Sequence, residues 1–135
     1  MTKKKKVVVR AKKKEAVARA IAKAGKGRIT INKRNIETIK QKYFKALIKE
    51  PLMLAEDAVK NIDIIVNVKG GGATSQIMAS RGAIAKAIIE YLKDEKLKKK
   101  FLAYDRMLLV DDARRVEPKK QLGPKARRKK QKSKR

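Results

Sequence analysis

The chain contains no cysteine, no histidine and no tryptophan among its 135 residues, and only 4% of them are aromatic. Without cysteine there can be no disulfide and no thiol nucleophile. Without cysteine and histidine, the common zinc sites and Ser/His/Asp catalysis have no ligands or base. The sequence therefore predicts a protein that is not an enzyme and that carries no metal or other cofactor.

Acidic residues are also scarce. Only 13 Asp and Glu stand against 40 Lys and Arg, which gives a formal net charge of +27. In one small domain this charge would repel itself without a polyanionic partner. Nucleic acid is the partner that the composition favours.

Long hydrophobic runs are missing as well. No apolar stretch approaches the roughly 20 residues of a membrane span. The basic start of the chain is followed by three valines and then more lysine, not by a signal-type hydrophobic region. We expect a cytoplasmic protein that has no membrane contact.

What the sequence does have is charge concentrated at its two ends. Eight basic residues precede Glu15 and ten follow Glu117, and none of the acids lies outside this interval. Blocks of like charge are usually disordered alone and order against polyanions. We expect a basic arm over residues 1–6, one globular domain over 7–117 and an extended basic tail over 118–135.

Hydrophobic patterning predicts a hairpin and a helix in the first half. Residues 16–24 are rich in helix-forming alanine, yet they alternate with a period of two, and we favour a strand. The glycines of 25–27 and the alternation over 28–32 then predict a β-hairpin. Asn35 is expected to cap a helix that ends before Pro51 and packs on this hairpin.

The second half predicts a buried strand and a helix. The strand covers 62–68 and ends at three glycines. Thr74 and Ser75 are expected to cap the next helix, in which apolar residues recur at helical spacing. The lysine-rich run 96–100 interrupts this periodicity, and a short final element is expected over 101–110. Nothing beyond it resembles core.

Two motifs suggest chemistry, and each has a plainer explanation. The glycines at 70–72 match neither the P-loop nor the dinucleotide fingerprint. They form a strand-to-helix turn, a close approach to an RNA phosphate, or both. The carboxylate pairs 56–57 and 111–112 would diverge on a helix or strand, so we expect caps or ion-pair partners. Most of the aromatic residues are expected in the core.

Several segments together resemble the ninth small-subunit ribosomal protein family. Residues 14–20 with 25–32 are similar to its N-terminal hairpin, and 50–52 with 68–87 to its middle. The ending, from Asp112-Ala113-Arg114-Arg115 to Lys134-Arg135, matches the family's basic tail almost position by position. The segment 117–120 looks like the archaeal and eukaryotic cytoplasmic branch, with an archaeal source favoured. Ser75 stands where the family usually has glycine.

The resemblance implies an α/β (α+β) domain with a small sheet covered by two helices and a basic C-terminal tail. It also implies a left-handed βαβ crossover, as in the second domain of another small-subunit ribosomal protein. Such a protein would be a structural constituent of the ribosome. It would bind ribosomal RNA and neighbouring proteins in the head of the small subunit, and its tail would reach the peptidyl-site tRNA.

The resemblance and the charge pattern together assign the contact residues. The tRNA contact falls on Lys134 and Arg135. The expected rRNA-binding residues are Lys12, Lys13, Lys14, Arg19, Gly70, Gly71, Gly72, Arg114, Arg115, Lys119, Lys120, Lys125, Arg127, Arg128, Lys129, Lys130 and Lys132.

Two other classes of protein share part of this pattern. A chromatin-like DNA-binding protein shares the electrostatics, because counterion release is indifferent to the sugar. An RNA-modifying enzyme would need a cofactor motif or a convergent polar pocket, and the sequence offers neither. Co-sedimentation with small subunits in high salt distinguishes the ribosomal hypothesis from the DNA-binding one.

Overall fold

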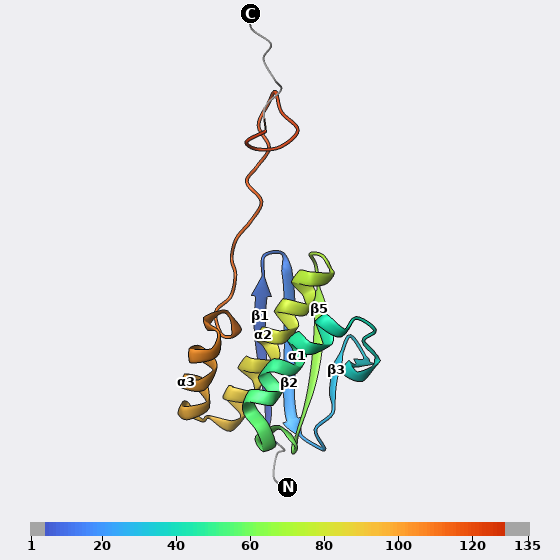
Figure 1. The fold of residues 1–135 in the computed structure, drawn as a ribbon, viewed down its shortest axis with the longest axis vertical. Helices are drawn as coiled ribbons and strands as arrows, with labels where there is room; N and C mark the ends of the chain where they lie inside the picture. Colours follow the sequence, from blue (N-terminus) through green and yellow to red (C-terminus); the bar gives the residue numbers. More distant parts are fainter. Residues whose placement is uncertain (1–4, 129–135) are drawn as a thin grey trace, which may run out of the picture.

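The computed structural model describes residues 5–128, which form one sheet, three α-helices and a C-terminal segment (Figure 1). The strands are β1 (Lys6–Lys13), β2 (Ala16–Ala24), β3 (Ile29–Ile31), β4 (Arg34–Asn35) and β5 (Ile62–Lys69). The helices are α1 (Lys42–Ala55), α2 (Ala73–Leu92) and α3 (Glu95–Tyr104), with short 3-10 turns η1 (Ile36–Thr38), η2 (Glu56–Val59) and η3 (Arg106–Leu108). The predicted α/β class is confirmed. Helix α3 is present in addition to the two helices that were expected.

The strand order in the sheet is β1-β2-β5-β3-β4. β2 is a strand, as its alternation predicts, but the predicted hairpin between 16–24 and 28–32 is wrong. The hairpin partner of β2 is β1, joined through the turn at Lys14 and Glu15, and β5 lies between β2 and β3. The turn at 25–27 is instead held by Asp63, whose Oδ1 accepts bonds of 2.9 Å from the backbone N–H of Lys26 and of Arg28.

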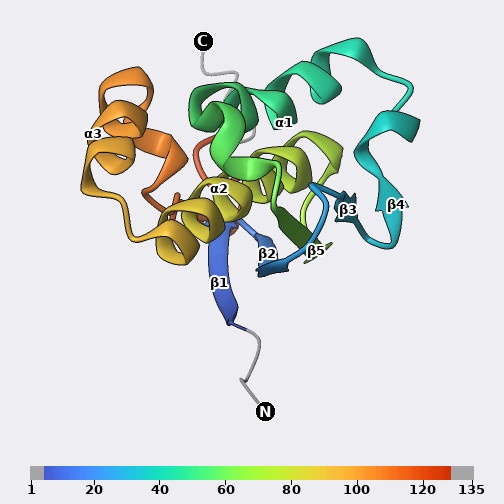
Figure 2. The same cartoon turned by 90° about the horizontal axis from the view of Figure 1, so that it is seen from below.

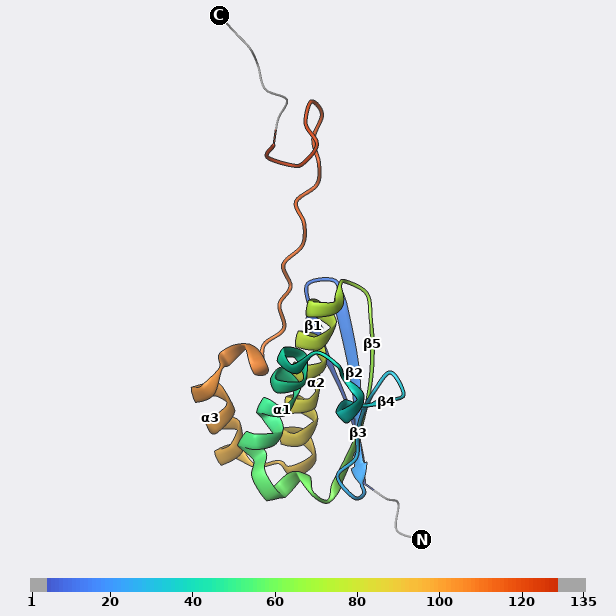
Figure 3. The same cartoon turned by 45° about the vertical axis from the view of Figure 1, so that its right-hand side comes forward.

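β3 and β5 are parallel neighbours, and the chain between them passes through α1. In Figure 1 both strands run upward, α1 lies in front of the sheet, and β5 lies to the left of β3. The view turned by 45° moves the helices to the left of the sheet, which agrees with their position in front (Figure 3). The crossover is therefore left-handed, as the resemblance implied, against the usual right-handed rule.

The core lies between the sheet and α2. Every second residue of β2 from Ala16 to Ala22 is a fully buried alanine, and β5 buries its aliphatic side chains on the same face. The small β2 residues let α2 approach closely, and α2 contributes alanines of its own, while Gly82 of α2 lies against Ala11 of β1. The helices cover one face of the sheet only (Figure 2).

Helix α1 differs from its prediction at both ends. Asn35 caps the 3-10 turn η1, accepting a bond from the Glu37 N–H, and α1 begins only at Lys42. The helix also continues through Pro51 to Ala55. A proline in a helix interior loses one hydrogen bond, but Pro51 is fully buried, and this burial offsets the loss. The main neighbours of α1 are α2 and α3, not the hairpin.

Helix α3 includes the lysine-rich run 96–100, where no helix was predicted because the lysines interrupt the spacing of apolar residues. Asp94 caps it by accepting bonds from the N–H groups of Lys96 and Leu97. Leu97 and Phe101, four residues apart, are its buried residues, so a narrow apolar stripe is enough to pack this helix on the domain.

At the start of α2, Gly72 is the N-cap and gives no side-chain bond, so the expected capping by Thr74 or Ser75 is wrong.

The aromatic residues are less buried than expected. Phe101 is fully buried, whereas Tyr43 and Tyr104 are more than half exposed. Within residues 5–128, no helix is both long and apolar enough to cross a bilayer.

Candidate nucleic-acid interface

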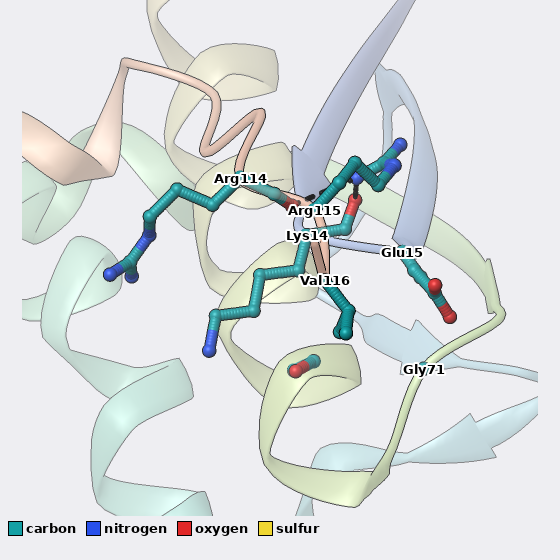
Figure 4. A pocket seen from close by; sticks show the side chains of 7 residues that line it. Lys14, Glu15, Gly71, Arg114, Arg115 and Val116 are labelled. Atoms are coloured by element: carbon teal, nitrogen blue, oxygen red, sulfur yellow. Dashed lines mark hydrogen bonds between the residues drawn. The ribbon is translucent and has the colours of Figure 1, made fainter. Parts of the chain in front are cut away.

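Three distant parts of the chain meet at the end of the sheet where α2 begins. They are the β1–β2 turn, the glycine loop after β5, and the segment that follows η3. Together they enclose a hollow of about 380 Å³, which we call the basic hollow (Figure 4). Its lining residues are Lys14, Glu15, Gly71, Ser75, Arg114, Arg115 and Val116.

Asp112 anchors the third segment beside β1. Its backbone N–H donates to the Lys12 carbonyl at 3.0 Å, and its carbonyl accepts from the Lys14 N–H at 2.8 Å. These bonds form an isolated parallel bridge between Lys13 and Asp112. The residues just after Asp112 are thereby held against the β1–β2 turn.

The carboxylate of Asp112 is buried, with 5% of the residue exposed, and both of its oxygens accept hydrogen bonds. It accepts from Arg114 Nε at 3.0 Å and pairs with Lys13 Nζ at 2.8 Å. The Arg114 guanidinium first, and the Lys13 ammonium next, hold the pKa of Asp112 well below its ordinary value. Asp112 therefore stays ionised and fixes Arg114 at the rim of the hollow, with most of the arginine side chain exposed.

The other cations of the basic hollow have no carboxylate partner among the described residues. Arg115 donates to the carbonyl oxygens of Lys14 and Arg114. The Lys14 ammonium takes part in no ion pair within residues 5–128, and Figure 4 shows its side chain extending past Val116. Glu15 is the one acid of the lining. The lining is therefore rich in cations, although the charged ends of Lys14, Arg114 and Arg115 point in different directions (Figure 4).

The conformation of the glycine loop is explained by contacts within the protein. Gly70 and Gly71 have φ angles of 85° and 64°, in the region that favours glycine. A Cβ on Gly70 would lie 2.6 Å from the Glu15 carbonyl oxygen, whereas a Cβ on Gly72 would meet nothing within 4 Å. The loop thus packs backbone to backbone against the β1–β2 turn, and only Gly71 borders the hollow.

The remaining predicted contact residues lie elsewhere. Lys13 does not line the hollow and forms an ion pair with Asp112. Arg19 lies on the uncovered face of the sheet, where the strand alternation also places Lys12. The exposed tail residues Lys119, Lys120, Lys125, Arg127 and Arg128 belong to a segment without helix or strand. Lys129, Lys130, Lys132, Lys134 and Arg135 lie outside the described residues.

The acidic pairs serve as ion-pair partners, as predicted. Asp111 pairs with Lys86, Glu56 with Lys100, and Asp57 with Lys60. Residues 5–128 contain no group of three or more acidic side chains that could hold a metal ion. The sequence did not indicate that Asp112 organises the hollow, although its spacing of two from Arg114 is the local signal for their contact.

Comparison with known proteins gives one consistent family. The profile described as Ribosomal protein S9/S16 matches residues 11–135. A protein of Methanococcus maripaludis, named small ribosomal subunit protein uS9, is 50% identical over 123 residues, which cover 88% of this chain and 92% of that protein. The protein of the same name from Thermoplasma acidophilum is 50% identical over 127 residues, which cover 94% and 98%. That of Picrophilus torridus is 49% identical over 122 residues, covering 90% and 92%.

Proposed function

Because the chain belongs to the ribosomal protein S9/S16 family, whose members are structural proteins of the ribosome and not enzymes, we propose that it binds small-subunit ribosomal RNA through the basic hollow and the tail. One observation carries the proposal. Lys14, Arg114 and Arg115 line one hollow although about a hundred residues separate Lys14 from the two arginines.

A phosphate group fits this hollow better than a protein carboxylate does. Arg114 and Arg115 already donate to Asp112 and to backbone carbonyl oxygens, but each guanidinium group has further N–H donors for a phosphate, and Lys14 adds a point charge. The first turn of α2 also begins beside the hollow, and because the N-cap is Gly72, no side chain caps the N–H groups of this turn. Helix N-termini favour anions. Because none of these groups reads a base, the hollow would position the protein on the RNA backbone.

The first prediction concerns the double substitution Lys14→Gln with Arg115→Gln. We expect it to weaken binding to deproteinised small-subunit RNA by about 1 to 3 kcal/mol, as for one or two charge-assisted phosphate contacts. The slope of log K against log salt concentration should fall by about two. Filter binding at several salt concentrations measures both quantities.

The matched control is Lys98→Gln with Lys99→Gln, which removes the same charge from exposed positions on α3. We expect a smaller loss of affinity from the control. Equal losses for the two double variants would show that net charge alone acts, and the hollow would lose its role. Thermal unfolding of each variant checks that the fold is retained.

The tail is proposed to serve a second ligand. An extended chain spans at most about 3.3 to 3.6 Å per residue, so residues 118–135 can carry a charge roughly 60 Å from the domain. Lys134 and Arg135, outside the described residues, would then reach the peptidyl-site tRNA, while the tail nearer the domain stays on rRNA. Neighbouring proteins of the subunit head are further proposed partners.

The second prediction separates tRNA contact from assembly. Deleting Lys134 and Arg135 should leave assembly intact and weaken peptidyl-site tRNA binding by about 1 to 3 kcal/mol. The loss should shrink as salt rises, because the contacts are electrostatic. A filter-binding titration of tRNA to purified subunits that carry the truncated protein gives the measurement.

The control for this deletion is Lys119→Gln with Lys120→Gln, at the base of the tail. These substitutions should affect attachment to rRNA and leave tRNA affinity of assembled subunits unchanged. Unaltered tRNA affinity of the truncated protein at low salt, with normal assembly, would mean that the tail serves rRNA alone.

A further inference from the structure

The face of the sheet that turns away from the helices is uncovered by any described part of the chain (Figures 2 and 3). We call it the open face. Its side chains follow from the alternation of β1, β2 and β5. They are Lys6, Val8, Arg10, Lys12, Val17, Arg19, Ile21, Lys23, Asp63, Ile65, Asn67 and Lys69.

The strand register arranges the open face in rows across the sheet. Arg10 pairs with Arg19, and Arg19 pairs with Asn67, which makes one row of hydrogen-bonding side chains. The next row along the strands is aliphatic, because Val8 pairs with Ile21 and Ile21 with Ile65. Val8 is 61% exposed. A shallow depression of about 650 Å³ covers much of both rows.

The arginine row lacks a counter-charge. Among residues 5–128, neither Arg10 nor Arg19 takes part in an ion pair, and the one acid of the open face, Asp63, accepts bonds from the turn at 25–27. Like charges directly opposite on neighbouring strands are destabilising. The two Cα atoms of such a pair lie only about 4.5 to 5.5 Å apart, so both guanidinium groups can close on one phosphate.

We propose that the open face is a second RNA-binding surface, on which Arg10 and Arg19 clamp a backbone phosphate and the aliphatic row lies against sugars or base faces. This inference rests on the proposed RNA-binding function. Six cations and one engaged acid favour a phosphate backbone over a protein partner, which would have to supply several carboxylates. The face has no aromatic residue, so it would recognise shape and charge and not stack single-stranded bases.

The open face also extends the function. The basic hollow lies where α2 begins, on the side of the sheet that the helices cover, and the open face lies on the other side. A protein with an RNA contact on each side holds two RNA segments at a fixed distance. The domain would therefore act as a bridge within the folded RNA, in addition to anchoring its own tail.

The first test is affinity. Arg10→Gln with Arg19→Gln in the full chain should weaken binding to deproteinised small-subunit RNA about tenfold at low salt, and should reduce the salt slope by one to two. Lys98→Gln with Lys99→Gln again serves as the charge-matched control. The melting temperature of the arginine variant should not fall, because the substitution relieves repulsion. An affinity loss no larger than that of the control would overturn the inference.

The second test identifies the occupant. Because the chain has no cysteine, Ile21→Cys and Ser75→Cys each introduce a unique thiol, one on the open face and one in the basic hollow. Each variant, labelled with a maleimide photo-crosslinker, is assembled into small subunits and irradiated. We expect RNA crosslinks from both thiols, at two different segments of the RNA.

The outcomes separate the two hypotheses. Crosslinks to protein alone, or none, from position 21 would overturn the open-face inference while leaving the hollow intact. Absence of RNA crosslinks from position 75 would overturn the proposed use of the hollow. Crosslinks from both positions to the same RNA segment would refute the bridge.

Discussion

Replacing Arg81 with methionine is expected to lower the free energy of unfolding by about 3 kcal/mol. Arg81 lies on α2 with only 4% of its surface exposed. It pairs with Glu50 on α1 and, at 3.2 Å, with Asp105, which caps η3. Methionine fills similar space but leaves two half-buried carboxylates facing each other without a cation. Urea unfolding followed by circular dichroism measures the loss.

The control for this substitution is Lys45→Met. Lys45 pairs with Glu37 at 2.7 Å, but that carboxylate is more than half exposed. Exposed pairs contribute about 0 to 1 kcal/mol, so the control should change stability little. Because the chain carries a net charge of +27, removing any cation relieves some repulsion. A comparable stability of the two variants would show that the buried Arg81 network contributes nothing beyond its charge.

Replacing Gly70 with alanine is expected to cost about 3 kcal/mol of stability. A positive φ is unfavourable for any residue with a Cβ, and here that atom would also overlap the Glu15 carbonyl oxygen at 2.6 Å. Both partners are backbone, so neither can move without displacing a strand end or the β1–β2 turn. Thermal and urea unfolding of the full chain give the measurement.

The neighbouring glycines supply a graded comparison. Gly72→Ala should be nearly neutral, because its φ is negative and its Cβ would meet nothing within 4 Å. Gly71→Ala should fall between the two, since a positive φ there is combined with contacts of 3.3 Å. Equal effects at positions 70 and 72 would contradict the close backbone approach as the reason for the glycine.

Local patterns in the sequence predicted individual elements better than their partners. The period of two over 16–24 identified β2, and the apolar run after Asn61 identified β5. Strand pairing, however, is set by contacts between distant segments. The β1–β2 turn has no glycine, and Lys14 itself takes the left-handed conformation with a φ of 54°. The glycines at 25–27 were a stronger turn signal, and they misled the assignment of the hairpin.

The candidate site was predicted in its parts and not as a whole. The resemblance and the charge pattern singled out Lys14, Gly71, Arg114 and Arg115 one by one. Their convergence depends on the bridge between Lys13 and Asp112, for which no local periodicity gives a signal. The open face was predicted only in part. Lys12 and Arg19 were among the expected contact residues, but no strand was predicted over 6–13, and only the register brings Arg10 opposite Arg19.

The bridge between Lys13 and Asp112 also sets an order of events during synthesis. Chains emerge N-terminus first, at about 5 to 20 residues per second. The β1–β2 hairpin can form early, whereas the basic hollow needs Arg114 and Arg115, which are made about a hundred residues after Lys14. A nascent or truncated chain that ends before Arg114 therefore has the β1–β2 hairpin with Lys14 but lacks the two arginines. The complete hollow forms only when the domain is nearly finished. The geometry thus makes the complete hollow a late product of translation.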